Sequence, residues 1–307
     1  MSDSKVRVRV EGRELTLTNL DKVLYPDKGF TKSQVIDYYT RIAPVLLPHL
    51  DGRPLTVKRY PNGVEDKFFF EKNAPSHNPD WIRTARLATP GSTKDRDTAN
   101  FPIIRDLPSL VYYANLAALE LHVPMWRVGP RGKVHAPDTL VFDLDPGPPA
   151  TIVECARVAC LLRDRLAEDG LTSYPKTSGK KGMQLYVPVR GVKAGTSQTS
   201  DYAKALAQRL EAERPGEIVS RMAKKERPGK VFIDWSQNNP AKTTVAPYSL
   251  RAAALPTAST PLEWAEVEAC EKPADLVFTS DDVLARAEEL GDLFAPLLGD
   301  ETRGVLG

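Results

Sequence analysis

The segment TLVFDLDPGPP, which begins at Thr139, constrains the fold more than any other part of the sequence. Its alternating apolar start predicts a strand, and the prolines and glycine after it predict that the strand ends there. Residues two apart in a strand point to the same face, so Asp143 and Asp145 project together. Phe142 and Leu144 then face the core. We expect the two carboxylates to lie at a sheet edge that is open to a ligand.

Strands and helices follow one another along the chain in no regular order. A strand or hairpin over Val6–Thr18 precedes a helix that begins at Thr31, where Gln34 supplies a capping-box pattern. The other predicted helices are Leu107–Leu121, Ile152–Asp169 and Tyr202–Glu213, and the other predicted strands are Pro54–Tyr60, Thr139–Leu144, Met183–Val189 and Val231–Trp235. Two or three short helices beyond Pro261 form a covering layer. Because strand and helix do not alternate regularly, an α+β fold is favoured over a doubly wound sheet.

Charge and composition narrow the possible partners. The 307 residues include 42 Lys and Arg against 40 Asp and Glu, so a polyanion site must come from local clustering rather than from net charge. The N-terminus has no apolar signal-peptide core, and no apolar run is long enough to span a membrane. Cys155, Cys160 and Cys270 have no metal-type spacing, and their odd number argues against a disulfide framework. We expect a cytoplasmic protein with reduced cysteines.

A third acid occurs in a similar setting. Asp234 lies in VFIDW, a strand so apolar that a lone aspartate needs a reason; the alternative is a structural carboxylate bonded to a turn. A lone Asp-x-Asp pair is more often a solvated turn than a metal site. Adjacent carboxylates repel, however, and a magnesium or manganese ion with oxygen ligands removes that conflict. Three aspartates on strands can bridge two cations, which can activate a 3′-hydroxyl and stabilise a leaving pyrophosphate.

Groups that suit phosphate surround these acids in the sequence. Thr177–Gly182 (TSGKKG) is a short loop whose amides, hydroxyls and ammonium groups fit a triphosphate, although its spacing is not that of a Walker A loop. Basic residues flank the acids at Lys58, Arg59, Arg221, Lys224, Lys225, Arg227, Lys230, Lys242 and Arg251. Each alone is best explained as a solvated surface residue. As a set they favour a polyanionic substrate.

Aromatic residues and histidines add less specific signals. Phe68–Phe70 interrupts a charged stretch, and strand alternation requires one or two of these rings to leave the core side. Such rings can stack on bases, or they can form a hydrophobic strand edge. The four histidines, at positions 49, 77, 122 and 135, have no metal-ligand spacing, and His122 ends a predicted helix.

Taken together, these segments resemble the polymerase domain of bacterial ATP-dependent DNA ligase D, in the archaeo-eukaryotic primase superfamily. The resemblance extends from about Leu15 to Gly299 and is carried by TNLDKVLYP, KRYPNGV, FFFEK, ALELHVPMW, LVFDLDPG, TSGKKGMQLYVP and GKVFIDWSQNNPAKTTVAPYSLR. It implies an α+β, archaeo-eukaryotic primase-like catalytic core, with mixed and antiparallel sheets flanked by helices, and an N-terminal flanking subdomain. We expect one primase-polymerase domain over residues 1–307. Its expected parts are a flanking part with a 5′-phosphate pocket (1–60), a catalytic core (61–260) and a helical cover (261–307).

The resemblance also implies roles for individual residues. The catalytic, metal-binding acids would be Asp143, Asp145 and Asp234. The 5′-phosphate beyond a gap or break would be held by Asn19, Lys22 and Lys32. The template strand would be contacted by Lys58, Arg59, Phe69 and Phe70. The incoming nucleotide would be bound by His122, Ser178, Lys181, Gln184, Gln237, Lys242 and Arg251.

Two positions depart from the family pattern. Family members commonly carry a histidine where this chain has Gln184, and glutamine can donate a hydrogen bond to phosphate but cannot become cationic. We expect triphosphate affinity or rate to be affected. Gly91–Asn100 is longer and more charged than usual, so the pairing of DNA ends is expected to differ.

The resemblance implies a template-dependent primase-polymerase that fills short gaps or extends ends in DNA repair, uses two manganese or magnesium ions and prefers ribonucleotides. Its expected partners are DNA with a gap or break bearing a 5′-phosphate, NTP or dNTP, a separate ATP-dependent DNA ligase and Ku. The chain has no ligase or nuclease segment, so we expect a stand-alone polymerase at the bacterial nucleoid. Two alternatives stay open. One is a catalytically weak DNA-end or 5′-phosphate-binding module, and the other is a metal-dependent phosphohydrolase or nuclease that uses the same acids.

Overall fold

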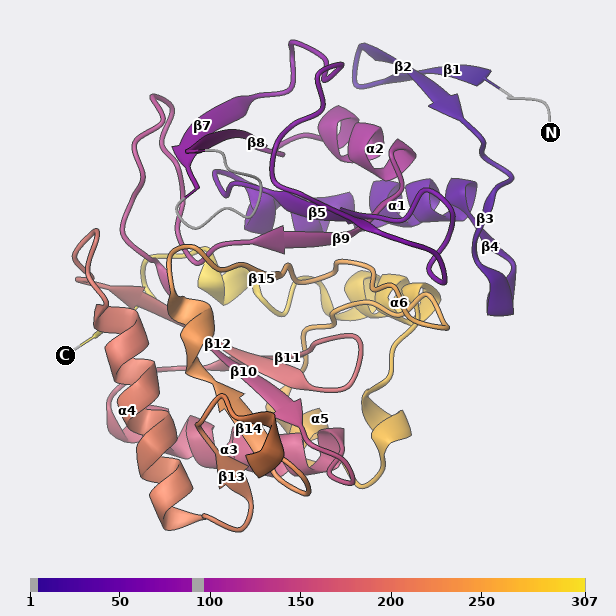
Figure 1. Ribbon diagram of the computed structural model, residues 1–307. Coiled ribbons are helices and arrows are strands. Elements are labelled where there is room, and N and C mark those ends of the chain that lie inside the picture. The colour runs from indigo at the N-terminus through magenta and orange to yellow at the C-terminus, as the bar shows by residue number, and fades with distance from the viewer. Residues whose placement is uncertain (1–4, 90–96, 307) are drawn as a thin grey trace.

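The computed structural model describes residues 5–89 and 97–306, and two β-sheets organise it (Figure 1). In Figure 1 a four-stranded sheet lies in the upper half and a six-stranded sheet in the lower half. Gly91–Asn100, expected to be unusually long and charged, falls mostly outside the described residues. None of the helices in the described part is long and apolar enough to cross a membrane. The α+β class predicted from the sequence is confirmed.

The six-stranded sheet carries the acidic strands. Its order is β11 (Tyr174–Thr177), β12 (Met183–Arg190), β10 (Thr139–Pro146), β14 (Val231–Asp234) and β13 (Ile218–Val219), with β16 (Gly304–Val305) beside β12. The pairs formed by β10, β11, β12 and β14 are antiparallel, while β13 and β16 pair in parallel. Strand β10 therefore lies between two partners along its acidic end.

The four-stranded sheet is antiparallel throughout. Its order is β15 (Thr244–Val245), β9 (Ala118–Val123), β5 (Thr56–Arg59) and β6 (Phe69–Glu71). Three two-stranded hairpins complete the strands: β1 (Lys5–Val10) with β2 (Arg13–Thr18), β3 (Val23–Tyr25) with β4 (Phe30–Thr31), and β7 (Thr84–Ala88) with β8 (Thr98–Pro102). The hairpin predicted over Val6–Thr18 is confirmed.

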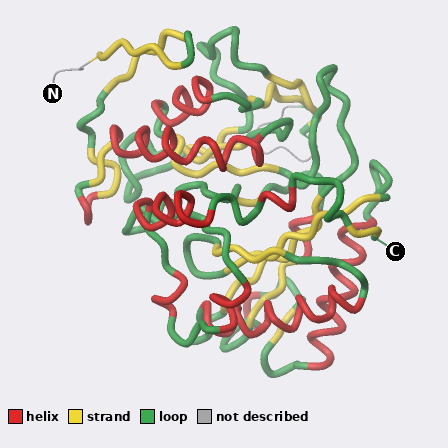
Figure 2. The backbone as a smooth tube through the Cα atoms, turned by 180° about the vertical axis from the view of Figure 1, so that it is seen from behind, coloured by secondary structure: helices red, strands yellow, loops and turns green. Residues whose placement is uncertain are grey.

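Helices flank both sheets, as the view from behind shows (Figure 2). The α-helices are α1 (Lys32–Leu50), α2 (Leu107–Asn115), α3 (Ile152–Glu168), α4 (Gln198–Glu213), α5 (Trp264–Glu268) and α6 (Ser280–Leu290). Short 3₁₀ turns are η1 (Pro26–Lys28), η2 (Lys224–Glu226), η3 (Trp235–Asn238), η4 (Pro273–Leu276) and η5 (Ala295–Leu297). The tail beyond Pro261 holds several of these short helices, as predicted. The proposed division at residues 60 and 260 stays a prediction.

Helix α1 begins where the sequence predicts. The Thr31 hydroxyl accepts a hydrogen bond from the amide of Gln34, whose side chain accepts one from the Thr31 amide. Such a cap is worth about 1 kcal/mol. The helix buries Tyr38 and Tyr39, which donate to the carbonyls of Tyr248 and Leu119 at 2.7 Å each. These bonds fasten α1 to β9 and to the segment after β15.

Strand β10 has the predicted faces but not the predicted position. Phe142 and Leu144 are fully buried under α3, in one apolar cluster with Leu162. The expectation of a sheet edge is wrong, because β12 and β14 pair with β10 on its two sides. Asp143 and Asp145 reach solvent because they lie at the end of a central strand, not because the strand is unpaired.

The predicted helix Leu107–Leu121 is two elements. Helix α2 ends at Asn115, the chain turns through Ala117 with a φ of 57°, and β9 begins at Ala118. The Asn115 side chain accepts from the Thr18 amide at 3.0 Å and so joins the end of α2 to β2. Every residue of β9 is buried, although Leu119–Val123 alternates between apolar and polar side chains, the period-2 pattern of a strand. His122 therefore lies in a strand and does not end a helix.

Candidate active site

A cavity of about 620 Å³ opens where the two sheets face each other. The six-stranded sheet contributes Asp143, Asp145 and Gln184, and the four-stranded sheet contributes His122. The other predicted residues in its lining are Ser178, Lys181, Gln237 and Arg251. The structure thus brings together eight residues that the sequence analysis assigned to the acids or to the nucleotide.

Four polar side chains form one row across the sheet. Lys176 of β11 pairs with Gln184 of β12, Gln184 with Asp143 of β10, and Asp143 with Asp234 of β14. Paired residues of antiparallel strands point to the same face. Nε2 of Gln184 donates to Oδ1 of Asp143 at 3.0 Å, and Nζ of the buried Lys176 donates to the Ser259 hydroxyl at 2.5 Å. Asp143 and Asp234 are therefore placed side by side by the register of neighbouring strands and not by a loop.

Burial and mutual repulsion raise the pKa values of two of the acids. Burial, followed by the charge of Asp145, raises the pKa of Asp143 to about 7, against the pull of the Gln184 hydrogen bond. Burial and then Asp234 raise the pKa of Asp145. A divalent cation would relieve this repulsion, and carboxylate oxygens are the ligands that Mg²⁺ and Mn²⁺ prefer.

The third acid, Asp234, is hydrogen-bonded to the turn η3 that follows it in the sequence. Asp234 accepts from the Ser236 amide at 3.0 Å, from the Ser236 hydroxyl at 2.5 Å and from Nε2 of Gln237 at 2.8 Å. Nζ of Lys242 lies 3.9 Å from its Oδ2 and also bonds the Ser236 hydroxyl. Within the described ranges, no three His, Cys, Asp or Glu side chains are arranged to hold a metal ion. A cation shared by the three acids would have to replace the bonds between Asp234 and η3, and would compete with the bond that Gln184 donates to Oδ1 of Asp143.

The phosphate-type loop over residues 178–182 has a fixed shape. The Ser178 hydroxyl accepts from the amides of Lys180 and Gly182 at 3.3 and 3.2 Å, and Nη1 of Arg251 donates to the Ser178 carbonyl at 2.5 Å. Gly179 has a φ of 72°, and a Cβ there would lie 2.6 Å from Cγ of Arg251. The loop is therefore held in one conformation beside the acids.

A buried glutamate that the sequence analysis missed joins the parts of this cavity. Glu120 of β9 is fully buried. Its carboxylate is surrounded by Nζ of Lys58 at 3.2 Å, Nε2 of His122 at 3.0 Å, Nζ of Lys180 at 3.1 Å, Nε of Arg251 at 3.4 Å and the Ala252 amide at 3.1 Å. Burial acts to raise the pKa of Glu120. The His122 hydrogen bond and the Arg251 charge outweigh burial and hold that pKa well below its usual range.

His122 is uncharged at neutral pH. Burial lowers its pKa to about 4, although the hydrogen bond with Glu120 acts in the opposite direction. Its ring faces Phe70 with the centroids 6.5 Å apart.

The predicted template residues lie on β5 and β6. Lys58 sits over the Phe68 ring at 5.4 Å, and Nη1 of Arg59 donates to both oxygens of Glu71 at 3.1 Å. Phe68, Phe69 and Phe70 are 51%, 53% and 43% exposed, so all three rings leave the core rather than one or two. Phe69 and Phe70 are consecutive in β6 and point to opposite faces of the strand, so each face carries an exposed ring that suits stacking.

The predicted 5′-phosphate residues lie together but outside the cavity. The Lys32 amide donates to the Lys22 carbonyl at 2.8 Å, and the Lys22 amide donates to the Asn19 carbonyl at 3.1 Å. Nζ of Lys22 bonds Asn62 at 2.9 Å, whereas Nζ of the buried Lys32 bonds the Thr18 carbonyl at 2.6 Å. They form a separate group at the start of α1.

Comparison with known proteins identifies this arrangement. The family described as LigD, primase-polymerase domain, matches residues 31–294. The chain belongs to the LigD primase-polymerase family. This confirms the resemblance and gives the enzyme class, a nucleotidyltransferase of the polymerase or primase type.

Individual relatives agree with the family match. The multifunctional non-homologous end joining DNA repair protein LigD of Mycobacterium tuberculosis is 45% identical over 94% of this chain and 37% of its own length. The bifunctional LigD of Bacillus subtilis is 33% identical over 91% of this chain and 43% of that protein. The chain therefore spans about two-fifths of these LigD proteins.

A solved structure covers almost the same unit. The polymerase domain from Mycobacterium tuberculosis ligase D, in complex with DNA, is 43% identical and superposes with a TM-score of 0.85. The match covers 93% of this chain and 98% of that domain. The LigD polymerase domain and this chain thus share their fold nearly end to end.

Proposed function

We propose that this LigD-family chain is a template-dependent primase-polymerase that fills short gaps or extends ends in DNA repair. The observation that carries the proposal is the cavity in which Asp143 and Asp145 face a phosphate-type loop and Arg251. Acids alone would also suit a nuclease. Acids placed opposite a triphosphate-sized basic lining favour nucleotidyl transfer.

Two divalent ions, manganese or magnesium, would be held by Asp143, Asp145 and Asp234, where they would supply activation of a primer 3′-hydroxyl and stabilisation of pyrophosphate. The chain's own groups do the positioning. Lys181 and Arg251 neutralise charge on the triphosphate, the Ser178 hydroxyl donates a hydrogen bond to it, and Gln184 keeps Asp143 oriented. The neutral ring of His122 packs against the incoming nucleotide.

The proposed DNA substrate follows from two groups of residues outside the acids, one aromatic and one basic. Phe69 and Phe70 offer stacking surfaces for the template, and the group at the start of α1 offers lysines for a downstream 5′-phosphate. The proposed substrates are therefore gapped or broken DNA with a 5′-phosphate, and NTP in preference to dNTP. The cellular setting we propose is end joining at the bacterial nucleoid, with an ATP-dependent DNA ligase and Ku as partners.

The test is extension of a labelled primer on gapped DNA. We expect extension with Mn²⁺ or Mg²⁺ that is faster with ribonucleotides, is stimulated by a downstream 5′-phosphate and is abolished in Asp143→Ala. Lys22→Ala should lose only the stimulation by the 5′-phosphate. Absence of extension with either metal would overturn the proposal, and shortening of the primer would indicate a nuclease instead.

A second candidate function is a catalytically weak module that binds DNA ends. Gln184 favours it, because an amide beside Asp143 cannot supply positive charge to the triphosphate. Tight binding of 5′-phosphorylated gaps without extension is the outcome that would support it.

A further inference from the structure

A second cavity, of about 660 Å³, lies at the opposite end of β10 from the acids. Its walls are the segment from Arg127 to Asp138, the end of β12, the start of β7 and the tail before β16. Five arginines line it: Arg83, Arg105, Arg127, Arg190 and Arg303. Asp51 and Asp138 are its acidic lining residues. We call it the arginine cavity.

The acids do not balance this charge. Asp138 is shared among three guanidinium groups: Nη2 of Arg53 lies at 2.7 Å, Nε of Arg127 at 2.9 Å and Nη2 of Arg303 at 4.0 Å. Asp138 can neutralise one of them, and Asp300, whose Oδ1 lies 3.3 Å from Nη1 of Arg303, can neutralise a second. The arginine cavity therefore keeps an excess of positive charge in a chain whose net charge is +2.

Several donors in the cavity remain unused. Arg105 and Arg190 are exposed, and neither guanidinium group has an ion-pair or hydrogen-bond partner among the residues that the structure describes. Nε of Arg303 is buried without a hydrogen-bond partner. Arg83 uses one donor on the Gly129 carbonyl at 2.5 Å. Arg105 and Arg190 thus keep their guanidinium donors available to a ligand, whereas Arg83, Arg127 and Arg303 already use some of theirs within the protein.

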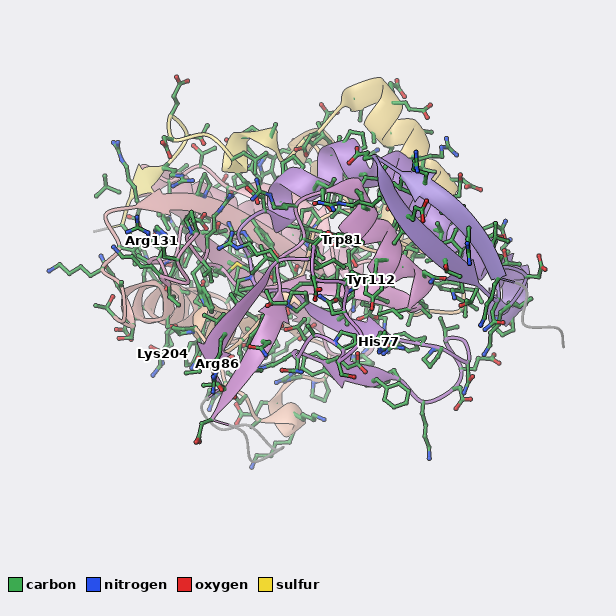
Figure 3. All side chains as sticks on the ribbon, turned by 90° about the horizontal axis from the view of Figure 1, so that it is seen from above. His77, Trp81, Arg86, Tyr112, Arg131 and Lys204 are labelled. Atoms are coloured by element: carbon green, nitrogen blue, oxygen red, sulfur yellow. The ribbon has the colours of Figure 1, made fainter. Side chains whose placement is uncertain are left out.

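The neighbouring surface extends the same charge. The bridge between Val128 and Val134 closes a hairpin beside the cavity, and its tip carries Arg131 and Lys133. Figure 3 places Arg131 on the opposite side of the molecule from the β1–β2 hairpin. Arg131 and Lys133 thus add two positive charges within a few residues of the cavity-lining segment.

We propose that the arginine cavity is a second phosphate site, which binds the backbone of a DNA arm beyond the active site. Guanidinium groups bind phosphate through paired hydrogen bonds and keep their charge at any physiological pH. Phosphates repeated along a strand match arginines distributed around a wide cavity better than one compact anion does. The identity of the polymer rests on the proposed function.

The geometry sets a length for that arm. Asp138 precedes β10 and Asp145 lies near its end, seven residues away, and a strand rises about 3.3 Å per residue, which gives roughly 23 Å. Duplex DNA rises about 3.4 Å per base pair, so about seven base pairs span that distance. Shorter arms cannot reach from the acids to the arginine cavity.

The test compares Arg105→Gln/Arg190→Gln with wild type for binding of gapped DNA whose arms are shortened separately from 16 to 4 base pairs. The matched control is Arg209→Gln/Arg214→Gln, which removes two exposed arginines, one in α4 and one directly after it, that line neither cavity. We expect weaker binding of long-armed DNA only in the first variant, with the slope of log K against log salt reduced by about 1.8. Short-armed DNA should bind equally to all three proteins.

Binding is measured without metal or nucleotide, so it does not depend on catalysis. If the protein bound DNA in an arm-length-dependent way but extended no primer, the proposed polymerase function would be rejected while the phosphate site in the arginine cavity would still be supported. The arginine-cavity proposal would be overturned if both variants bound every DNA as wild type does. An equal loss of binding in the Arg209/Arg214 control would also overturn it. Titration of inorganic pyrophosphate tests the other source of phosphate: a loss there in the first variant, with no dependence on arm length, would also overturn the DNA assignment.

Discussion

At the scale of single residues, Glu120 shows how a buried charge can organise a site. It lies on β9 of one sheet, while Lys180 comes from the loop between β11 and β12 of the other sheet and Arg251 from the segment after β15. Removing one partner of a buried ion cluster leaves the other charges uncompensated. Glu120 therefore holds the nucleotide-side cations at fixed positions before any substrate is present.

We predict that Glu120→Ala lowers the free energy of unfolding by about 3 kcal/mol. Glu120→Gln should keep the packing but raise the KM for nucleotide, since Lys180 and Arg251 lose their anchor. Urea unfolding and steady-state extension measure the two effects. Glu71→Gln is the control, because its pair with Arg59 is partly exposed and is worth about 0–1 kcal/mol. Equal effects of the Glu71 and Glu120 substitutions would contradict the role given to Glu120.

The amide at position 184 gives a second prediction. Gln184→His would place a titratable ring beside the triphosphate, and a hydrogen bond from a cation is worth about 1 kcal/mol more than one from a neutral donor. We expect the KM for nucleotide to fall about fivefold at pH 6 and less at pH 8. Gln184→Asn should show no such pH dependence. A KM unchanged by histidine at both values would show that position 184 does not contact the phosphates.

Protonation of Asp143 gives a third prediction, on stability. Its pKa is about 7 in the folded protein, above the usual value of 3.8, so the folded state binds the proton more tightly than the unfolded state does. Proton binding by Asp143 therefore stabilises the folded state at low pH, and this contribution to the free energy of unfolding is lost as pH rises from about 4 to about 7. In the presence of a chelator, the stability of Asp143→Asn relative to wild type should increase as pH rises across this window. Thermal unfolding at several pH values would measure this difference. A stability difference that is constant with pH would contradict the shift.

At the scale of elements, the loop of residues 178–182 depends on close packing at one glycine. Gly179→Ala should raise the KM for nucleotide and destabilise the protein, because its Cβ would meet Arg251 and the Ala258 carbonyl. Gly229→Ala is the matched control, with nearly the same φ of 73° but open space around the added Cβ. Backbone strain alone should cost about 1 kcal/mol in both. Extension kinetics that are equally affected in the two variants would reject the packing explanation.

Elements with a clear local pattern were predicted from the sequence. The capping box at Thr31 and the faces of β10 were both confirmed, because each depends on residues within a few positions of one another. The prediction for the segment after Asn115 was wrong because the helical pattern of α2 was extended past the turn at Ala117, although Leu119–Val123 alternates between apolar and polar residues as a strand does. Glu120, one of the two polar residues in that alternation, was missed together with the strand.

At the scale of the whole molecule, the active-site cavity exists because two sheets face each other. The acids and the phosphate-type loop could be chosen from sequence, since each has its own motif. Their meeting with His122 and Lys58 could not be derived from local patterns, because those residues belong to the other sheet. The resemblance to the LigD polymerase domain supplied that information.

A bound cation should stabilise the whole fold. A ligand that binds only the folded state adds about 2.7 kcal/mol at one hundred times its Kd. We expect saturating Mn²⁺ to raise the Tm of wild type measurably and that of Asp143→Asn much less. Ca²⁺, which takes oxygen ligands without supporting transfer in the proposed scheme, serves as a comparison. An identical rise in both proteins would place the bound ion elsewhere.

The row of Lys176, Gln184, Asp143 and Asp234 limits how such a chain can vary in length. Each member is aligned by strand register, and a shift of one residue turns a side chain to the other face of the sheet. A single-residue insertion or deletion inside β10 or β12 would therefore bury a carboxylate or expose Phe142, and no adjustment of nearby loops could restore the row. Length changes should be tolerated in the connections between these strands and excluded from the strands themselves.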